Sequence, residues 1–244
     1  MVSFFKKRKV IALQGFPGIG NVGKLLIDYL VRFYKPEKVK KITSNYLPNI
    51  VFVREQNLIE PPQIILYKKS LKDLDLLLLS GNVQPNDDYS AYVISDLISK
   101  ELAKENVSQL IAFGGIGLPV EPENPKLFIA GTDKQLVEAI KKKYKLKDSF
   151  GIVTHISGLA GLVPLSCEKR GISSIIIIAE TFANPFYLGI PSTRAALKFV
   201  KKYLNLEVNV SKFDKEFTIK TKKKIKAKTE QTPLNEVNDL SYIG

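Results

Sequence analysis

Short apolar runs alternate along the chain with longer stretches whose apolar residues recur at helical spacing. Runs of the first kind predict strands, and they lie at 10–13, 39–42, 50–53, 64–67, 76–79, 110–113, 127–130 and 175–178. Stretches of the second kind predict helices at 22–34, 91–104, from 132 or 133 to 144, after the turn 157–161 up to 169, and at 193–204. Candidate capping residues precede two of these helices: Asp87, Asp88 or Ser90 in one case, and Thr132 or Asp133 in the other.

Two local patterns indicate how the strands pair. The run 175–178 consists of isoleucines, and a continuous β-branched run is typical of a strand buried on both faces of a parallel sheet. The runs 64–67 and 76–79 are separated by the polar stretch 68–73, which predicts a hairpin-like antiparallel section. We therefore predict an α/β fold, a three-layer sandwich with a mostly parallel central sheet and an antiparallel section.

The character of the chain changes near residue 210. Residues 212–228 contain eight lysines against Asp214 and Glu216, and residues 229–244 contain three acids and no base. No regular apolar period runs through either stretch, so neither predicts a packed element. We expect an α/β domain over 1–210 and a lysine-rich, flexible C-terminal tail over 211–244.

Composition excludes several classes of site. The 244 residues include one cysteine, Cys167, and one histidine, His155, which excludes an internal disulfide, a cysteine-based zinc site and a multi-histidine metal centre. No apolar run approaches the roughly 20 residues of a membrane helix, and the start of the chain does not have the pattern of a signal peptide. We expect a cytoplasmic protein without a membrane partner, and the lack of Trp with single Met and Cys residues is typical of a thermophile.

The formal net charge of +13 raises the question of a nucleic-acid partner. Residues 1–210 hold 29 basic and 19 acidic side chains, and residues 211–244 hold 8 and 5. The excess is therefore spread over the predicted domain, and no helix-turn-helix, RNP or zinc-finger signature accompanies it. This distribution argues against nucleic-acid binding and favours a solvated basic surface.

A glycine-rich segment follows the first predicted strand. Gly18, Gly20 and Gly23 form G-x-G-x-x-G before a predicted helix, the context of a dinucleotide fingerprint. The acid that such a site needs about 20 residues later is missing, because 40–45 reads KKITSN. The same segment resembles a phosphate-binding loop up to Lys24, but Leu25 stands where a magnesium-binding hydroxyl is required. A tight turn that needs glycine for packing is one interpretation, and a small-ligand or dinucleotide site is the other.

Candidate catalytic residues are few. Glu180 follows the isoleucine run, at the edge where open parallel sheets bind ligands, and is the candidate acid or base; His155 is a second candidate. Gly114 and Gly115, which end another predicted strand, could form a second anion-binding turn with the first glycine segment. Each of these residues also has a purely structural interpretation, and Cys167 is expected to be buried and inert. No metal or cofactor is expected.

Several segments together resemble one known family. They are 15–23 (GFPGIGNVG), Gly114-Gly115, 156–162 (ISGLAGL), Glu180-Thr181 and 191–196 (PSTRAA), within about residues 9–205. In this order they resemble archaeal members of the proteasome assembly chaperone 2 family. Ser192 stands where that family usually has an acid.

The resemblance implies a phosphorylase/hydrolase-like sandwich similar to purine nucleoside phosphorylases, a homo-oligomer, and chaperoning of proteasome α-subunits. It also draws attention to the C-terminus, because proteasome activators end in a hydrophobic-Tyr-any tripeptide that docks between α-subunits. Leu240, Tyr242, Ile243 and Gly244 are therefore candidate partner-binding residues, although the tyrosine is third from last instead of second.

We thus expect a non-enzymatic proteasome assembly chaperone or proteasome-binding factor that binds α-subunits. One alternative is a nucleoside-phosphorylase or hydrolase-like enzyme with an anion at the glycine turns and Glu180 as its acid or base. The second alternative is a dinucleotide-binding protein.

Overall fold

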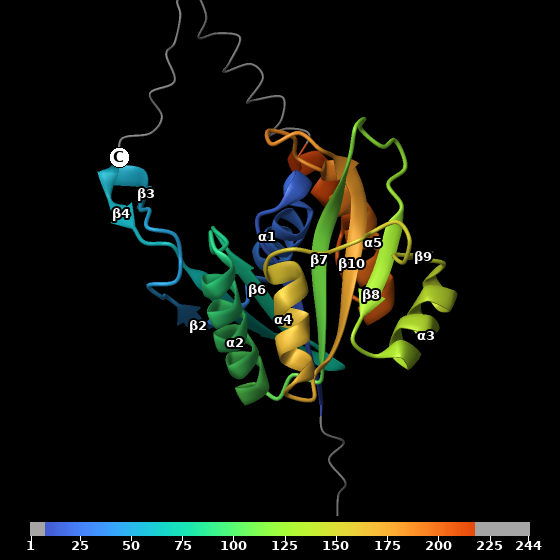
Figure 1. Cartoon of the computed structure of the whole chain (residues 1–244), viewed down its shortest axis with the longest axis horizontal. Helices are drawn as coiled ribbons and strands as arrows, with labels where there is room; N and C mark the ends of the chain where they lie inside the picture. Colours follow the sequence, from blue (N-terminus) through green and yellow to red (C-terminus); the bar gives the residue numbers. More distant parts are fainter. Residues whose placement is uncertain (1–7, 218–244) are drawn as a thin grey trace, which may run out of the picture. The chain divides into compact units, whose positions relative to one another are not determined.

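Eight strands form one mixed sheet in the computed structural model, which describes residues 8–217 of the chain (Figure 1). The strands are β1 Lys9–Gly15, β2 Glu37–Ile42, β5 Ile64–Ser70, β6 Leu74–Gly81, β7 Gln109–Leu118, β8 Leu127–Gly131, β9 Lys147–Asp148 and β10 Ser173–Phe182. Their order across the sheet is β2-β5-β6-β1-β7-β10-β8-β9. The chain divides into two compact units, Met1–Val208 and Asn209–Gly244, and the whole sheet belongs to the first.

The middle of the sheet is parallel. β1 pairs in parallel with β6 and with β7, and β7 pairs in parallel with β10. At one end of the order, β8 also pairs in parallel with β9. The antiparallel pairs are β2 with β5, β5 with β6, and β10 with β8. The predicted α/β class, with a mostly parallel sheet and an antiparallel section, is therefore confirmed.

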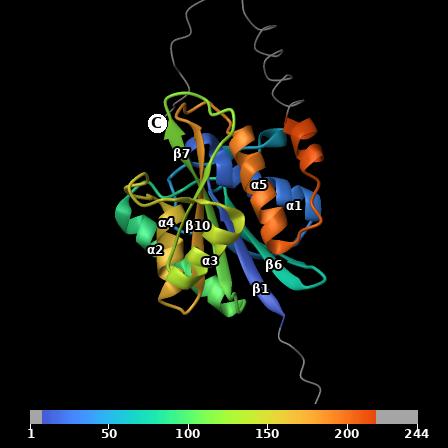
Figure 2. The same ribbon diagram turned by 90° about the vertical axis from the view of Figure 1, so that its right-hand side faces the viewer.

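Helices cover both faces of this sheet. They are α1 Val22–Tyr34, α2 Asp88–Lys104, α3 Lys134–Tyr144, α4 Leu159–Glu168 and α5 Ile190–Leu204. Figure 2 shows α1 and α5 on one face and α2 and α4 on the other, while α3 lies beside β8. None of the helices within residues 8–217 has the length and apolar character needed to cross a bilayer.

The core below α2 and α4 shows why these segments pack as they do. Alternate residues of the central strands, such as Ala12, Leu77 and Leu110, are fully buried against Ile98 of α2 and Val163 of α4. Burying one aliphatic side chain of this kind stabilises the fold by about 1.5–3 kcal/mol relative to leaving it exposed. The helical spacing of the apolar residues thus determines which face of each helix meets the sheet.

Hydrogen bonds at the helix ends confirm two predicted caps. The Asp87 carboxylate accepts a hydrogen bond from the backbone N–H of Ser90 at 2.9 Å, and the Asp133 carboxylate accepts one from Leu136 at 3.0 Å. Each satisfies a donor that the first helical turn would leave without a partner.

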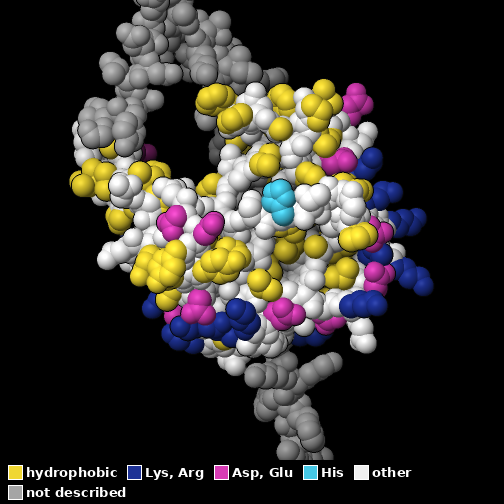
Figure 3. Space-filling model, viewed as in Figure 1, with side chains coloured by type: hydrophobic (Ala, Val, Ile, Leu, Met, Phe, Trp, Pro, Cys, Tyr) yellow, Lys and Arg dark blue, Asp and Glu magenta, His cyan; other side chains and the backbone are white. Residues whose placement is uncertain are grey.

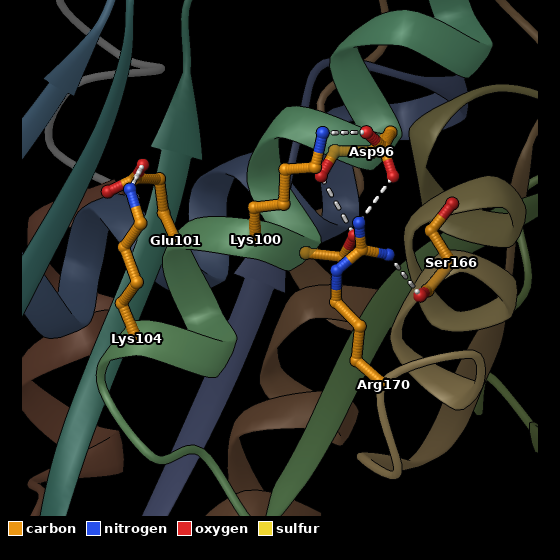
Figure 4. A network of polar contacts seen from close by, with 7 residues as sticks. Asp96, Lys100, Glu101, Lys104, Ser166 and Arg170 are labelled. Atoms are coloured by element: carbon orange, nitrogen blue, oxygen red, sulfur yellow. Dashed lines mark hydrogen bonds and ion pairs between the residues drawn. The ribbon is translucent and has the colours of Figure 1, made fainter.

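A polar network joins the two helices on that face (Figure 4). The Arg170 guanidinium, just beyond α4, donates to Asp96 of α2 at 2.5 Å and to the Ser166 carbonyl at 3.2 Å. Lys100, one turn along α2, lies 2.7 Å from the other oxygen of Asp96. Hydrogen bonds from Lys100 and then Arg170 hold the pKa of Asp96 below its ordinary value.

Three strand predictions are corrected by the structure. β7 and β10 extend to Leu118 and Phe182, beyond the predicted ends at 113 and 178, because their backbones continue to pair with each other. The predicted strand 50–53 is reduced to β3, Phe52–Val53, which pairs with the unpredicted β4, Ile59–Glu60. These two strands form a separate small sheet that projects from the large one (Figure 1).

Candidate functional site

The glycine-rich segment connects β1 to α1 through one turn of 3-10 helix, Ile19–Asn21. Gly20 has a φ of 62°, in the left-handed region that favours glycine. Its carbonyl accepts a hydrogen bond from the backbone N–H of Gly189 at 2.8 Å, which ties the loop to the start of α5. The loop therefore has a fixed conformation that its neighbours hold in place.

Most of these glycines are required for packing. A Cβ atom on Gly20 would lie 2.3 Å from Thr181 Oγ1, one on Gly23 would lie 2.5 Å from the Phe113 carbonyl oxygen, and one on Gly115 would lie 2.4 Å from the Ile19 carbonyl oxygen. All three distances are far shorter than any ordinary contact, so these positions allow the loop to lie directly on β7 and β10. Gly18 differs, because nothing lies within 4 Å of its Cβ position.

Gly114 and Gly115 do not form a turn. They lie inside β7, where they pair with Ile178 and Ala179 of β10. The prediction that the strand ends there is wrong, because glycine in a strand also permits a close approach by another backbone, and at Gly115 that backbone is Ile19. The backbone of the glycine loop therefore occupies the sheet edge at which the enzyme hypothesis places an anion.

Lys24 is engaged within its own helix. Its ammonium lies 2.6 Å from both carboxylate oxygens of Asp28, and the Ser80 hydroxyl donates to the same carboxylate at 3.2 Å. A phosphate-binding lysine would instead point toward the loop that precedes it.

Glu180 and His155 are not brought together. Glu180 lies within β10, not at its end, and its carboxylate accepts a hydrogen bond from the backbone N–H of Lys126 at 2.9 Å. The backbone N–H of Glu180 donates to the Lys126 carbonyl at 3.0 Å, so this residue fastens the loop before β8 to the sheet. His155 is exposed, and its Nδ1 lies 3.0 Å from the Thr154 hydroxyl. No hydrogen bond or ion pair within residues 8–217 joins Glu180 to His155.

Other candidate reactive groups are structural. Cys167 is fully buried in the core beside α2, and this burial raises the pKa of its thiol to about 12. Among the described residues, no group of three or more His, Cys, Asp or Glu side chains has an arrangement that could hold a metal ion. The predicted residues thus supply packing and hydrogen bonds but form no common catalytic centre.

The same edge of the sheet presents apolar side chains to solvent. Phe186 is 95% exposed, Val120 is 68% exposed and Ile19 is 50% exposed; we call these three residues the edge patch. They lie in the glycine loop and in the loops that follow β7 and β10, and Figure 3 shows apolar side chains gathered over this end of the molecule. Large apolar groups at such exposure mark an interaction surface more often than a chemical site.

The two longer loops of the edge patch are held together. The Tyr187 hydroxyl donates to the Glu121 carboxylate at 2.6 Å, and the backbone N–H of Ala183 donates to the Leu118 carbonyl at 2.9 Å. Burial and the neighbouring Glu121 raise the pKa of Tyr187, so it stays a hydrogen-bond donor at neutral pH. Val120 and Phe186 therefore project from two loops that hydrogen bonds hold together.

Sequence reasoning did not identify the edge patch. Its residues lie outside any periodic element, and Val120 follows a proline-containing loop start in which nothing local indicates exposure. The predicted C-terminal residues Leu240, Tyr242, Ile243 and Gly244 lie outside the described residues.

Comparisons with known proteins agree on one relationship. A family model described as the PAC2 family matches residues 12–221. An uncharacterized protein of Methanocaldococcus jannaschii is 30% identical over 247 residues, which cover 96% of this chain and 92% of that protein.

Similar solved structures point to the same relationship. Pyrococcus furiosus PbaB, an archaeal proteasome activator, is 26% identical with a TM-score of 0.80, and the match covers 92% of this chain and 94% of PbaB. Pyrococcus furiosus PbaA, an archaeal homolog of proteasome-assembly chaperone, is 19% identical with a TM-score of 0.74, over 92% of this chain and 89% of PbaA. The PbaA comparison supports the fold alone.

Proposed function

Since this chain belongs to the PAC2 family, we propose that it is a proteasome-binding factor, an assembly chaperone or activator that binds proteasome α-subunits. The observation that carries the proposal is the likeness to the proteasome activator PbaB, which extends over more than nine-tenths of both chains. We further propose that the protein acts as a homo-oligomer in the cytoplasm, that it performs no catalysis, and that its sandwich is of the phosphorylase/hydrolase-like class.

The chemistry of the edge patch supports binding to a protein. Exposed side chains such as Phe186 and Val120 can enter apolar pockets of a partner, and buried aromatic anchors contribute most of the energy of many protein interfaces. The neighbouring glycine loop is packed against the strands, so this end of the sheet presents a contact surface and not a ligand cavity. We therefore assign the edge patch to the contact with α-subunits.

The C-terminal residues supply a second proposed contact. Leu240, Tyr242 and Ile243 bring together an aromatic and two aliphatic side chains within four residues. A peptide of this kind can bury its ring and its aliphatic groups in an apolar groove of the partner.

Retention on immobilised α-subunits tests the proposal. The variants are V120S/F186S, a chain that lacks residues 240–244, and the control Leu165→Ser, which alters an exposed leucine on α4. We expect the wild-type chain and the control to bind equally, and V120S/F186S to bind at least about tenfold more weakly, the effect of losing roughly 1.4 kcal/mol. The truncated chain should also bind more weakly.

Each binding result tests a different part of the proposal. If the wild-type chain is not retained, the proposed function is wrong. If it is retained and V120S/F186S binds as well, the edge patch is not the contact surface. Equal binding by the truncated chain would remove the C-terminal residues from the interface.

A further inference from the structure

The small sheet formed by β3 and β4 belongs to an arm, residues 50–60, in which Phe52 packs against the core but most other apolar side chains are exposed. Val53 is 70% exposed, Ile59 is 68% exposed and Leu58 is 61% exposed. Each of the two strands has only two residues, and an isolated two-stranded hairpin is marginally stable at best in water. Three large aliphatic groups at the end of such an arm are therefore expected to be covered by a partner.

The charges within the arm indicate what kind of partner it fits. Between Lys41 and Lys68 the only basic residue is Arg54, and its guanidinium donates to Glu60 at 3.0 Å and lies 5.2 Å from the centre of the Phe52 ring. Glu55 is exposed and forms no ion pair with any residue in the range 8–217. The arm is thus apolar and slightly acidic, in a chain whose net charge is +13.

The start of α2 extends this surface. The Tyr46 ring, just before the arm, meets the Tyr89 ring edge-on with centroids 5.8 Å apart. Tyr89 is exposed, and so is Asp88 beside it. We call the combined surface the arm face and define it by Glu55, Val53, Leu58, Ile59, Asp88 and Tyr89.

Exposed residues near the opposite end of the strand order have a charge opposite to that of the arm. Lys142, at the end of α3, and Lys147, in β9, are exposed and form no ion pair within residues 8–217. Phe150, which follows β9, is 96% exposed, and Ile152 is 56% exposed. We call these four residues the α3 face. Figure 3 shows lysine and arginine side chains along this side and apolar side chains over the arm on the other side.

The two faces cannot meet within one molecule. The arm is inserted between β2 and β5, which begin the strand order, and α3 connects β8 to β9, which end it. Contact of two arm faces would bring Glu55 and Asp88 against like charges, and contact of two α3 faces would bring lysines together. Contact between an arm face and an α3 face instead joins apolar to apolar and acid to base.

We propose that the arm face of one copy of this chain docks on the α3 face of the next, so that copies associate head to tail. Such a contact is heterologous, and repeating it produces a closed ring when the rotation between copies closes. This inference rests on the homo-oligomer proposed above and adds the two surfaces that form it.

Complementation between variants tests the proposal. The arm variant is V53S/I59S, the α3-face variant is K147E/F150S, and the control is Leu165→Ser on α4, which belongs to neither face. The mass of the full chain in solution is measured for each protein by light scattering at tens of micromolar. We expect the wild-type chain and the control to form the same oligomer and each variant alone to be a monomer.

An equimolar mixture of the two variants provides the decisive result. Each retains one intact face, so the mixture should form a 1:1 dimer and nothing larger. This recovery also shows that both variants are folded. The proposal is overturned if the wild-type chain is monomeric, if either variant alone assembles like wild type, or if the mixture stays monomeric.

The outcome is distinguishable from a failure of the proposed function. A wild-type chain that is monomeric but retained on α-subunits contradicts the homo-oligomer and its head-to-tail contact, and leaves the proposed binding to α-subunits standing. A chain that forms the oligomer but is not retained on α-subunits contradicts only the proposed function.

Discussion

At the scale of single residues, the glycines between β1 and α1 differ in the space around them. An alanine methyl at Gly23 would lie 2.5 Å from the Phe113 carbonyl oxygen, whereas nothing lies within 4 Å of the corresponding position at Gly18. We expect Gly23→Ala to lower the free energy of unfolding by about 1–3 kcal/mol, the usual cost of overpacking. Gly18→Ala should change it by less than about 0.5 kcal/mol, as at other open surface positions. Urea denaturation of both variants checks this, and equal destabilisation would contradict the packing role.

The sequence predicted the glycine loop and its place between a strand and a helix, but it left the role of the glycines open. G-x-G-x-x-G is compatible with a pyrophosphate site and with close packing, since both need residues without a side chain. Only the positions of Phe113 and Thr181, both more than 80 residues away, distinguish the two interpretations. Contacts of that kind have no local signature in the sequence.

The thiol of Cys167 should be unreactive in the folded protein. Burial raises its pKa to about 12, so at pH 8 only about one thiol in ten thousand is ionised, and the thiolate is the reactive form. We expect no reaction with dithionitrobenzoate in buffer and one thiol per chain in urea, because the chain has a single cysteine. Rapid labelling without urea would show that α4 opens readily.

At the scale of elements, the polar network between α2 and α4 has a pH dependence of known sign. Because Lys100 and Arg170 hold the pKa of Asp96 below 3.8, its carboxylate is charged and paired at neutral pH. Its contribution to stability is therefore present above about pH 4 and is lost as the pH falls through the lowered pKa. Arg170→Met should lower the free energy of unfolding by at most about 1 kcal/mol at pH 7, since Asp96 is partly exposed.

The measurement is urea denaturation of the wild-type chain and Arg170→Met at pH 7 and near pH 3. The difference between them should begin to shrink at the lower pH, because pH 3 lies below the ordinary pKa of an aspartate and the unfolded chain there takes up the proton that folded Asp96 resists. Lys104→Met is the matched control, because the Lys104 ammonium pairs with Glu101 on the exposed side of α2 and should contribute little. A difference for Arg170→Met that grows on acidification would contradict the assigned pairing.

Elements with a clear apolar period were predicted well, and elements that depend on distant partners were not. The helix 22–34 and the caps Asp87 and Asp133 follow from residues within one or two turns. The extension of β7 to Leu118 depends on pairing with β10, about 65 residues later, and the intervening glycines conceal it locally. β4 has only two residues, so it shows no periodicity at all.

At the scale of the whole molecule, the strand order determines which charged segments lie at opposite ends of the sheet. The sequence predicted that the charge is spread over the domain, but the strand order was needed to place the weakly acidic arm, between β2 and β5, at one end and the lysines of α3 and β9 at the other. Strands adjacent in the sequence are not always adjacent in this sheet: β5 lies next to β6, but β8 lies next to β10 and not next to β7. A surface made of segments from both ends of the strand order therefore cannot be derived from the order of residues.

The whole-molecule consequence of a packed glycine loop is that small anionic ligands should not stabilise the fold. A dinucleotide or phosphate present at 100 times its Kd would add about 2.7 kcal/mol to the free energy of unfolding. For a chain of this size, that corresponds to a rise in Tm of roughly 5–10 °C. We expect a shift in Tm below about 1 °C with NAD, NADP or phosphate at about 1 mM, because the loop lies on β7 and β10 and Lys24 is paired with Asp28.

Thermal unfolding of the wild-type chain provides the measurement, and Gly18→Ala is the control variant. A rise of several degrees that Gly18→Ala abolishes would establish a ligand site at the loop and favour the phosphorylase-like or dinucleotide-binding alternative over a protein-binding edge.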